Sequence, residues 1–259
     1  MTSPTTETPQ DAGPIQVKGL RKSFGKQKVL NGIDLEVKKG DTLSVLGQSG
    51  TGKSVLLKVL IGLEPPDSGS ICIHHQEING ASREKLNEIR TRIGFLFQNA
   101  ALYDSMTVEQ NVAFPLERHS DLSPAQRRKR VRELLAEVGM EKDLDKLPGQ
   151  ISGGMQKRVG LARALALSPD ILLFDEPTAG LDPITSSEID ELILRMQKEK
   201  NMTSVVVTHD LPSARAVSDR LALMRDGRVL IEGTFKDLEQ SQDDFVVQFL
   251  HRGRFRRSG

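Results

Sequence analysis

Gly47-Gln48-Ser49-Gly50-Thr51-Gly52-Lys53-Ser54 fits the pattern G-x-x-x-x-G-K-S/T of a phosphate-binding P-loop. The apolar residues of Thr42–Leu46 before it predict a buried strand, and those of Val55–Leu63 after it predict a buried helix. This order matters because glycines let backbone N–H groups turn inward, and the start of a helix adds partial positive charge where phosphates bind. The sequence therefore predicts a nucleotide site in which Lys53 reaches the β- and γ-phosphates and the Ser54 hydroxyl holds Mg²⁺.

The composition indicates a globular protein with a hydrophobic core, since the 259 residues are 37% hydrophobic and 27% charged. A net charge of +1 gives no general attraction to nucleic acid. A single cysteine, Cys72, excludes an internal disulfide, and no apolar run approaches the length of a membrane span. Residues 1–14 lack the basic start and apolar centre of a secretory signal, so we expect a disordered tail, and residues 251–259 are expected to form a basic tail.

Strands and helices alternate along much of the chain, which favours an α/β fold with a mostly parallel sheet. Ile15–Phe24 and Val29–Val37 are expected to pair around a turn at Gly25-Lys26-Gln27, and Asp226-Gly227 predicts a second hairpin. Further strands are expected at Ser70–His74, Ile93–Phe97, Ile171–Phe174, Ser204–Val207, Arg220–Met224 and Arg228–Ile231, and further helices at Arg83–Arg92, Val159–Leu167, Ile189–Met196, Pro212–Val217 and Phe235–Leu250.

Two side chains in the strand expected at Ser70–His74 are of interest. Cys72 is expected to be buried there. Adjacent His74 and His75 would point to opposite faces of that strand, so we expect a surface pair and not a metal site.

The segment from Gln98 to Gln150 shows no strand pattern. A helix is expected to begin near Ser123-Pro124 and to bury Val131, Leu134, Leu135 and Val138, which recur at helical spacing. The basic cluster Arg127–Arg130 on that helix is interpreted as a solvated face, since charge runs on helices are common. We expect residues 98–160, approximately, to form a helical subdomain inserted into the α/β core.

Acidic residues follow one of the apolar strands directly. Asp175 and Glu176 come after Ile171–Phe174, at the end of a strand where ligands bind in parallel sheets. Asp175 fits the role of holding Mg²⁺ through a water molecule, and Glu176 fits that of a general base that polarises the attacking water. His209 follows the next apolar strand, so we expect it beside Glu176, where it could contact the γ-phosphate.

A second anion site is predicted where Ser152-Gly153-Gly154 opens the helix that continues through Val159. It lies about a hundred residues from the first, and one nucleotide needs only one γ-phosphate cradle. Two half-sites in one chain indicate a head-to-tail dimer in which each of two nucleotides lies between two subunits.

Taken in order, these motifs resemble those of the ATPase subunit of an ABC transporter over nearly the whole chain. Gly47–Ser54 resembles Walker A and Ile171–Glu176 resembles Walker B, while Ile151–Met155 matches the signature with Ile for the usual Leu and Met for the usual Gln. Gln98 matches the Q-loop glutamine, Asp182 ends the D-loop segment, His209 matches the switch histidine, and Phe24 stands where the family places its adenine-stacking aromatic.

This resemblance implies a fold and a set of roles. The fold is an α/β ABC ATPase, a P-loop NTPase with a RecA-like core, an N-terminal antiparallel β subdomain and the inserted helical subdomain, all within one domain at residues 15–250. The cofactors are ATP and Mg²⁺. The catalytic residues are Lys53, Gln98, Glu176 and His209. The residues that bind Mg²⁺ are Ser54, Gln98 and Asp175. Phe24, the P-loop, Ser152, Gly153, Gly154 and Asp182 bind the nucleotide.

A finer resemblance is to the ATPase of Mla/Mce-type phospholipid transporters, carried by Phe97–Val108, Asn111–Leu116, Ser152–Met155, Leu181–Thr185 and Asp244–Leu250. It implies an ATPase at the cytoplasmic face of the inner membrane, with a separate permease, a second copy of the chain, substrate-binding Mce/Mla components and a small regulatory subunit as partners. The alternatives are an importer of amino acids or other small solutes and, from another class, a soluble ABC ATPase acting on nucleic acid or ribosomes. A single Walker A and the absence of sustained heptads count against the last. The short apolar run from Ala100 to Met106, with Tyr103, is expected to dock a permease helix.

Overall fold

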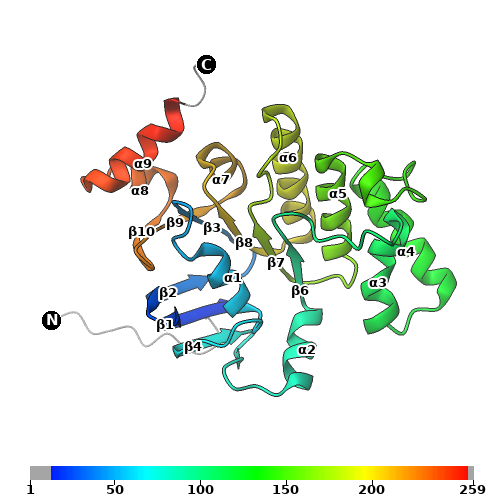
Figure 1. Cartoon of the computed structure of the whole chain (residues 1–259), viewed down its shortest axis with the longest axis horizontal. Helices are drawn as coiled ribbons and strands as arrows, with labels where there is room; N and C mark the ends of the chain where they lie inside the picture. Colours follow the sequence, from blue (N-terminus) through cyan, green and yellow to red (C-terminus); the bar gives the residue numbers. More distant parts are fainter. Residues whose placement is uncertain (1–12, 256–259) are drawn as a thin grey trace.

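A six-stranded sheet forms the centre of the described part of the chain, residues 13–255 of the computed structural model (Figure 1). The strand order is β10-β9-β3-β8-β7-β6. Five strands are parallel and β10 pairs antiparallel with β9 at one edge. The strands are β3 (Thr42–Gly47), β6 (Ile93–Leu96), β7 (Ile171–Asp175), β8 (Thr203–Thr208), β9 (Arg220–Arg225) and β10 (Arg228–Gly233).

The middle strands are buried along their whole length, because helices cover both faces of the sheet. Every residue of β3, β7 and β8 is buried. Alternate residues of β7 join different cores. Ile171 and Leu173 pack with helix α1 (Lys53–Leu60). Leu172 and Phe174 pack with helices α5 (Gly153–Ala164) and α6 (Pro183–Lys200). The helices around this sheet are α1 (Lys53–Leu60), α2 (Arg83–Thr91), α6 (Pro183–Lys200) and α7 (Leu211–Val217).

An antiparallel sheet lies below the central sheet in Figure 1, and α1 packs between the two. Its order is β2-β1-β4-β5, from β1 (Ile15–Phe24), β2 (Gln27–Val37), β4 (Ser68–Ile73) and β5 (Gln76–Glu77). Ile33, Leu35 and Val37 alternate into the core, as predicted. Gln27 pairs with Phe24, so the turn between β1 and β2 is shorter than expected.

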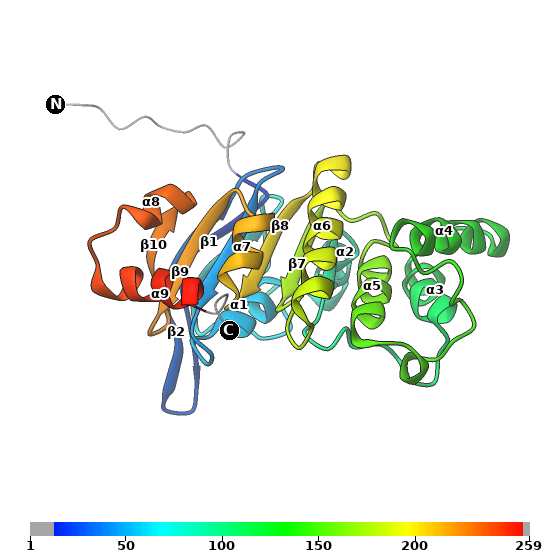
Figure 2. The same ribbon diagram turned by 90° about the horizontal axis from the view of Figure 1, so that it is seen from above.

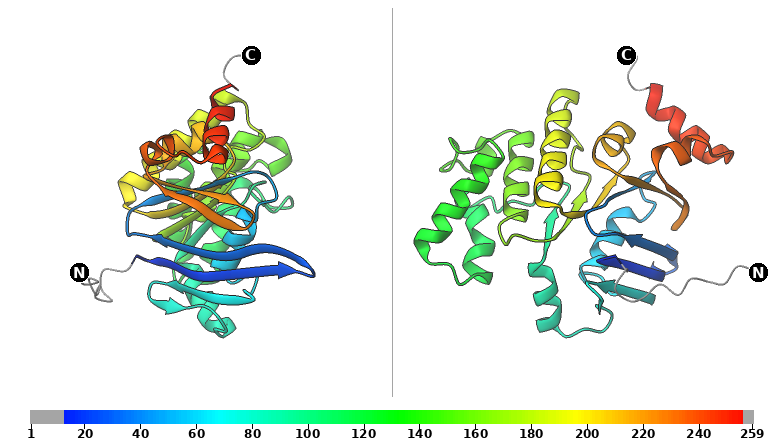
Figure 3. Two further views of the ribbon diagram at one scale, coloured as in Figure 1. Left: turned by 90° about the vertical axis from the view of Figure 1, so that its left-hand side faces the viewer. Right: turned by 180° about the vertical axis from the view of Figure 1, so that it is seen from behind.

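Helices alone fill the region between β6 and β7, as the sequence predicted. They are α3 (Val108–His119), α4 (Pro124–Glu137), the 3-10 turn η1 (Pro148–Gln150) and α5 (Gly153–Ala164). Thr107 and Ser123 start α3 and α4 with reciprocal capping bonds. The predicted stripe of Val131, Leu134, Leu135 and Val138 is fully buried, and α4 packs against α3 and α5. Figures 2 and 3 show these helices at the opposite end of the molecule from the antiparallel sheet.

The prediction of a single C-terminal helix at Phe235–Leu250 is wrong, because the chain forms two helices there, α8 (Phe235–Glu239) and α9 (Asp244–Phe255). Asp243 interrupts the helix, because its carboxylate accepts hydrogen bonds from the N–H groups of Phe245 and Val246 and so caps the start of α9. The expected basic tail therefore begins inside α9, and residues 256–259 lie outside the described residues.

The expected N-terminal tail ends earlier than predicted. Gly13 donates its N–H to Glu36 and the Pro14 carbonyl accepts from His74, so both residues are held against the antiparallel sheet. The remaining tail residues, 1–12, lie outside the described part.

The strand expected at Ser70–His74 ends one residue early, at Ile73. His74 and His75 form a turn with φ of 48° and 61°, and His74 Nε2 lies 2.9 Å from Asp170 Oδ1. The prediction that His74 and His75 point to opposite faces of a strand is therefore wrong. Cys72, which was expected to be buried, is only half-buried. Within residues 13–255, no three His, Cys, Asp or Glu side chains gather into a metal site, and no helix is long and apolar enough to cross a membrane.

Candidate nucleotide site

The P-loop connects β3 to α1 at the carboxyl end of the central sheet. Gly50 and Gly52 adopt φ of 82° and 97°, which side-chain-bearing residues rarely adopt. At Gly52 a Cβ would also lie 2.8 Å from the Val29 carbonyl oxygen of β2, so only glycine fits. No side chain caps the first N–H groups of α1. The loop thus presents free backbone donors and a helix start to an anion.

Lys53 is the first residue of α1, and its side chain is only 6% exposed. Its Nζ donates to the carbonyl oxygens of Gly47, at 2.8 Å, and Gln48, at 3.1 Å, and lies 3.9 Å from Glu176 Oε1. Burial lowers the pKa of Lys53, while the carboxylates of Glu176 and Asp175 oppose that shift. The loop therefore holds a cation between its own backbone and the acidic end of β7.

Ser54 and Asp175 meet although they are far apart in sequence. Ser54 Oγ donates to Asp175 Oδ1 at 2.8 Å. Burial raises the pKa of Asp175, and the hydrogen bond from Ser54 opposes that rise. The fold thus brings a hydroxyl and a carboxylate oxygen together beside the P-loop, as the sequence predicted.

Glu176 follows β7 with φ of 49°, a conformation uncommon outside glycine. Its N–H donates to the Val207 carbonyl of β8 at 2.8 Å. Its Oε2 accepts from the Thr208 hydroxyl at 3.2 Å and lies 2.9 Å from His209 Nδ1. The end of β8 therefore fixes the direction of the Glu176 carboxylate. His209 lies beside Glu176, as the order of the strands predicted.

Gln98 is exposed, in the loop that follows β6. The backbone carbonyl of Gln98 accepts a hydrogen bond from Lys157 Nζ. Lys157 also donates to the carbonyl oxygen of Glu176 at 3.0 Å. The sequence alone did not predict a role for Lys157; the signal for it is a lysine on the turn of α5 that also buries Val159 and Gly160.

The predicted signature turn caps α5. Ser152 Oγ accepts from the Met155 N–H, and Ser152 and Gly153 are exposed. A Cβ on Gly154 would lie 2.5 Å from Thr185 Cγ2 of α6, so any larger residue there would have to displace that methyl group. Figures 1 and 2 both place α5 apart from α1, with β7 and α6 between them. Within one chain the two anion sites are therefore separate.

Asp182 and Phe24 do not join the cluster of Lys53, Ser54, Asp175, Glu176 and His209. Asp182 caps α6, with its carboxylate accepting from Ile184 N–H, Thr185 N–H and the Thr185 hydroxyl. The Thr185 bonds lower the pKa of Asp182. Phe24 ends β1 with 45% of its surface exposed, and Lys22 Nζ lies 5.0 Å from its ring centre.

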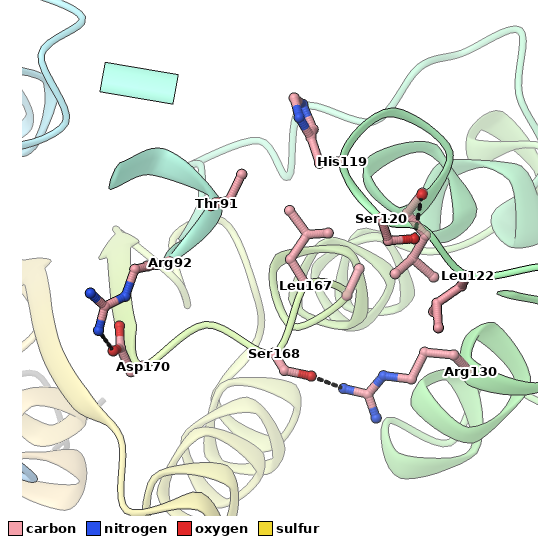
Figure 4. A pocket seen from close by; sticks show the side chains of 11 residues that line it. Thr91, Arg92, His119, Ser120, Leu122, Arg130, Leu167, Ser168 and Asp170 are labelled. Atoms are coloured by element: carbon pink, nitrogen blue, oxygen red, sulfur yellow. Dashed lines mark hydrogen bonds and ion pairs between the residues drawn. The ribbon is translucent and has the colours of Figure 1, made fainter. Parts of the chain in front are cut away.

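A recess of about 550 Å³ lies at the other end of the sheet (Figure 4). Its lining includes Arg92, paired with Asp170 at 2.5 Å, and Arg130, which donates to Ser168 at 3.1 Å. Asp170 immediately precedes β7, whereas Asp175 ends it. This recess is therefore not part of the phosphate site.

A P-loop beside a hydrogen-bonded serine–aspartate pair and an oriented glutamate defines a P-loop nucleotide hydrolase. The family model for the ABC transporter matches residues 30–179, more than half of the chain. The chain therefore belongs to the ABC transporter family and is an ATP-binding, ATP-hydrolysing subunit.

Curated relatives match most of the chain. The "Intermembrane phospholipid transport system ATP-binding protein MlaF" of Haemophilus influenzae is 41% identical, over 91% of this chain and 89% of that protein. The "Probable ribonucleotide transport ATP-binding protein mkl" of Mycobacterium leprae is 43% identical, over 93% of this chain and 69% of its own length. The "Methionine import ATP-binding protein MetN" of Rhizobium johnstonii is 41% identical, over 85% and 60%.

Solved structures share the fold. A dimeric post-hydrolysis state of the ATP-binding cassette MJ0796, bound to ADP and Pi, matches with a TM-score of 0.79 and 36% identity, covering 85% of this chain and 98% of that one. The cbiO1 structure from Clostridium perfringens, part of the ABC transporter complex cbiONQ, matches with a TM-score of 0.81 and 32% identity, over 95% and 100%. The predicted fold class is thus confirmed.

Proposed function

We propose that this chain energises phospholipid transport between membranes by driving a separate permease. The observation that carries the proposal is the match to the phospholipid transport protein MlaF, which spans 89% of that relative. The matches to the proteins named for ribonucleotide and methionine transport span 69% and 60% of those relatives. The resemblance thus extends over almost the entire MlaF protein.

A second candidate is the ATPase of a methionine or other small-solute importer, favoured by the 41% identity to the methionine import protein. The percentages of identity do not distinguish between these substrates. Identification of the permease that associates with the chain would distinguish between them. A role on nucleic acid ranks below both, because the net charge of +1 provides no general attraction to phosphate backbones.

The site fits Mg²⁺ by its donor set. Ser54 Oγ and Asp175 Oδ1 are 2.8 Å apart. A serine hydroxyl and an aspartate carboxylate are oxygen donors of the kind that Mg²⁺ prefers. We infer that Ser54 and Asp175 hold Mg²⁺, with Gln98 as a further contact and the ATP phosphates as the other partners. When bound, the metal would neutralise charge that develops on the phosphates.

The residues of this chain divide the reaction between them. The P-loop N–H groups and Lys53 bind the β- and γ-phosphates. Glu176 takes a proton from the attacking water, with its carboxylate held by Thr208 and His209. His209 contacts the γ-phosphate, and Phe24 stacks on the adenine with its exposed ring.

We propose that a second copy completes each site. Ser152, Gly153 and Gly154 form an anion-binding helix start that lies apart from the P-loop of the same chain. In a head-to-tail pair, this turn would contact the γ-phosphate of the nucleotide bound by the partner, with Asp182 beside it. The dimer bound to ADP and Pi among the structural relatives supports this arrangement.

The proposed membrane contact is narrower than the predicted apolar run. Ala100 is buried and Leu102 packs on the helical core, whereas Tyr103 is 46% exposed with its ring 4.9 Å from that of Phe114. Asn111, fully buried, ties the segment through bonds with Tyr103, Met106 and Thr107. We therefore propose Tyr103 as the docking contact for a permease helix, on the cytoplasmic face of the inner membrane.

The experiment is purification of the tagged chain from membranes, identification of the proteins that accompany it, and transport assays with the reconstituted complex. The proposal predicts a permease together with Mce/Mla-type substrate-binding components and a small regulatory subunit, and ATP-dependent movement of phospholipid between vesicles. A permease that carries methionine or another small solute would reject the lipid assignment and leave the ATPase intact. Tyr103→Ala should lose permease binding and retain ATP binding.

A further inference from the structure

Lys157 is a buried cation that the catalytic scheme above does not use. It lies on the second turn of α5, shortly after Ser152, and only 4% of its surface is exposed. Its Nζ donates to two backbone carbonyl oxygens, one of Gln98 and one of Glu176. One ammonium thus joins three functional segments: the signature helix, the loop after β6 and the loop after β7.

Those two loops leave the sheet side by side, because Leu96 of β6 pairs with Phe174 of β7. The carbonyls they present to Lys157 belong to the residue that contacts the metal in our scheme and to the general base. A shift of α5 that moved Lys157 would therefore act on both residues at once. Lys157 lies behind them and donates to their backbones, so its role is distinct from contact with ATP.

A second cation of α5 holds the loop after β6. Arg163 donates to the carbonyl oxygens of Ala100, at 2.5 Å, and Ala101, at 2.7 Å. Both alanines have left-handed backbones, with φ of 56° and 48°. Segment 98–101 is therefore fastened to α5 at three carbonyls, and Lys157 extends that attachment to Glu176.

We propose that Lys157 is a positioning residue that couples the signature helix to hydrolysis by fixing the backbones of Gln98 and Glu176 together. Movement of α5 as the two subunits close on ATP then reaches the general base through one side chain. The coupling acts in the chemical step, so it affects turnover more than affinity for ATP.

The test compares two substitutions at Lys157 in the full chain. Lys157→Met keeps the length and removes the donors, whereas Lys157→Gln keeps an NH₂ group that can serve both carbonyls. We expect Lys157→Met to lower kcat about tenfold or more and to change KM for ATP by less than about threefold. Lys157→Gln should recover most of that loss. Lys129→Met, at a lysine whose side chain is 81% exposed, is the matched control and should behave as wild type.

The split between kcat and KM provides the second readout, because a residue that positions the general base affects the chemical step and not the binding of ATP. Thermal unfolding of each variant identifies one that fails to fold. If Lys157→Met does not fold, Lys157→Gln alone decides, through the loss of kcat compared with the change in KM. A folded Lys157→Met with wild-type kcat, or folded variants in which KM for ATP changes as much as kcat, would overturn the proposal.

Discussion

His209 Nδ1 lies 2.9 Å from Glu176 Oε2, although the two residues are 33 positions apart. The contact exists because β7 and β8 are parallel neighbours whose carboxyl ends meet at one edge of the sheet. The Thr208 hydroxyl and the His209 N–H also point to the same carboxylate oxygen. The general base is therefore oriented by the end of the next strand.

The first prediction concerns this contact. His209→Ala should lower kcat by at least about tenfold, equivalent to about 1.4 kcal/mol of activation free energy, because the Glu176 carboxylate loses an orienting partner and the γ-phosphate loses a contact. ATP affinity should change little. Steady-state hydrolysis and equilibrium binding of a fluorescent ATP analogue measure the two effects. Wild-type turnover in this variant would remove His209 from the mechanism.

The second prediction concerns the P-loop cation. Lys53→Ala should reduce ATP hydrolysis by about 100-fold or more, as expected for loss of one preorganised donor to the transferring phosphoryl group. Its folding is expected to survive, since Lys53 is bonded to loop carbonyls and not to the hydrophobic core. Circular dichroism checks the fold. A folded variant with full turnover would contradict the P-loop assignment.

The third prediction concerns the adenine. Phe24→Ala should weaken ATP binding by about 1–3 kcal/mol through loss of ring stacking. Phe24→Tyr should bind normally, because a phenol ring stacks equally well. Titration calorimetry compares the three proteins. Unchanged affinity in Phe24→Ala would mean that the ring serves only to cover the Lys22 side chain.

The sequence predicted this site well wherever function depends on strand ends. All-apolar strands at β3, β7 and β8 identify the middle of a parallel sheet, and the residues that follow them must then lie together. Lys53, Ser54, Asp175, Glu176 and His209 do so. Periodicity also gave the buried stripe of α4.

The remaining features depend on contacts that periodicity does not encode. A single carboxylate, Asp243, divides the C-terminal helix by capping α9, and helical periodicity says little about such a break. His74 and His75 leave the strand because the turn to β5 needs left-handed residues. Lys157 bonds to two backbone carbonyls, and backbone partners leave no trace in the pattern of side chains.

The fourth prediction concerns a buried carboxylate between α6 and α7. Burial raises the pKa of Asp190 to about 6, against the hydrogen bond that the Ser213 hydroxyl donates to it at 2.5 Å. Between the ordinary pKa of 3.8 and about 6, the folded state binds more protons than the unfolded state, so this group lowers stability as the pH rises through that window.

Asp190→Asn removes this titration and keeps an oxygen that accepts from Ser213. Its free energy of unfolding should equal that of the wild type near pH 4 and exceed it by about 1–3 kcal/mol at pH 7. Urea unfolding of both proteins at several pH values measures the difference. A difference that is constant with pH would show that Asp190 titrates normally in the folded protein.

Glu176→Gln tests the account most directly, since it keeps the size of the side chain and removes the general base. ATP should still bind, hydrolysis should fall by about 100-fold or more, and the chain should accumulate as a dimer with two trapped ATP molecules. Light scattering with and without ATP, together with the rate of phosphate release, gives both results. The account predicts an ATP-dependent dimer that releases almost no phosphate, whereas near-wild-type phosphate release from a correctly folded Glu176→Gln protein would contradict it.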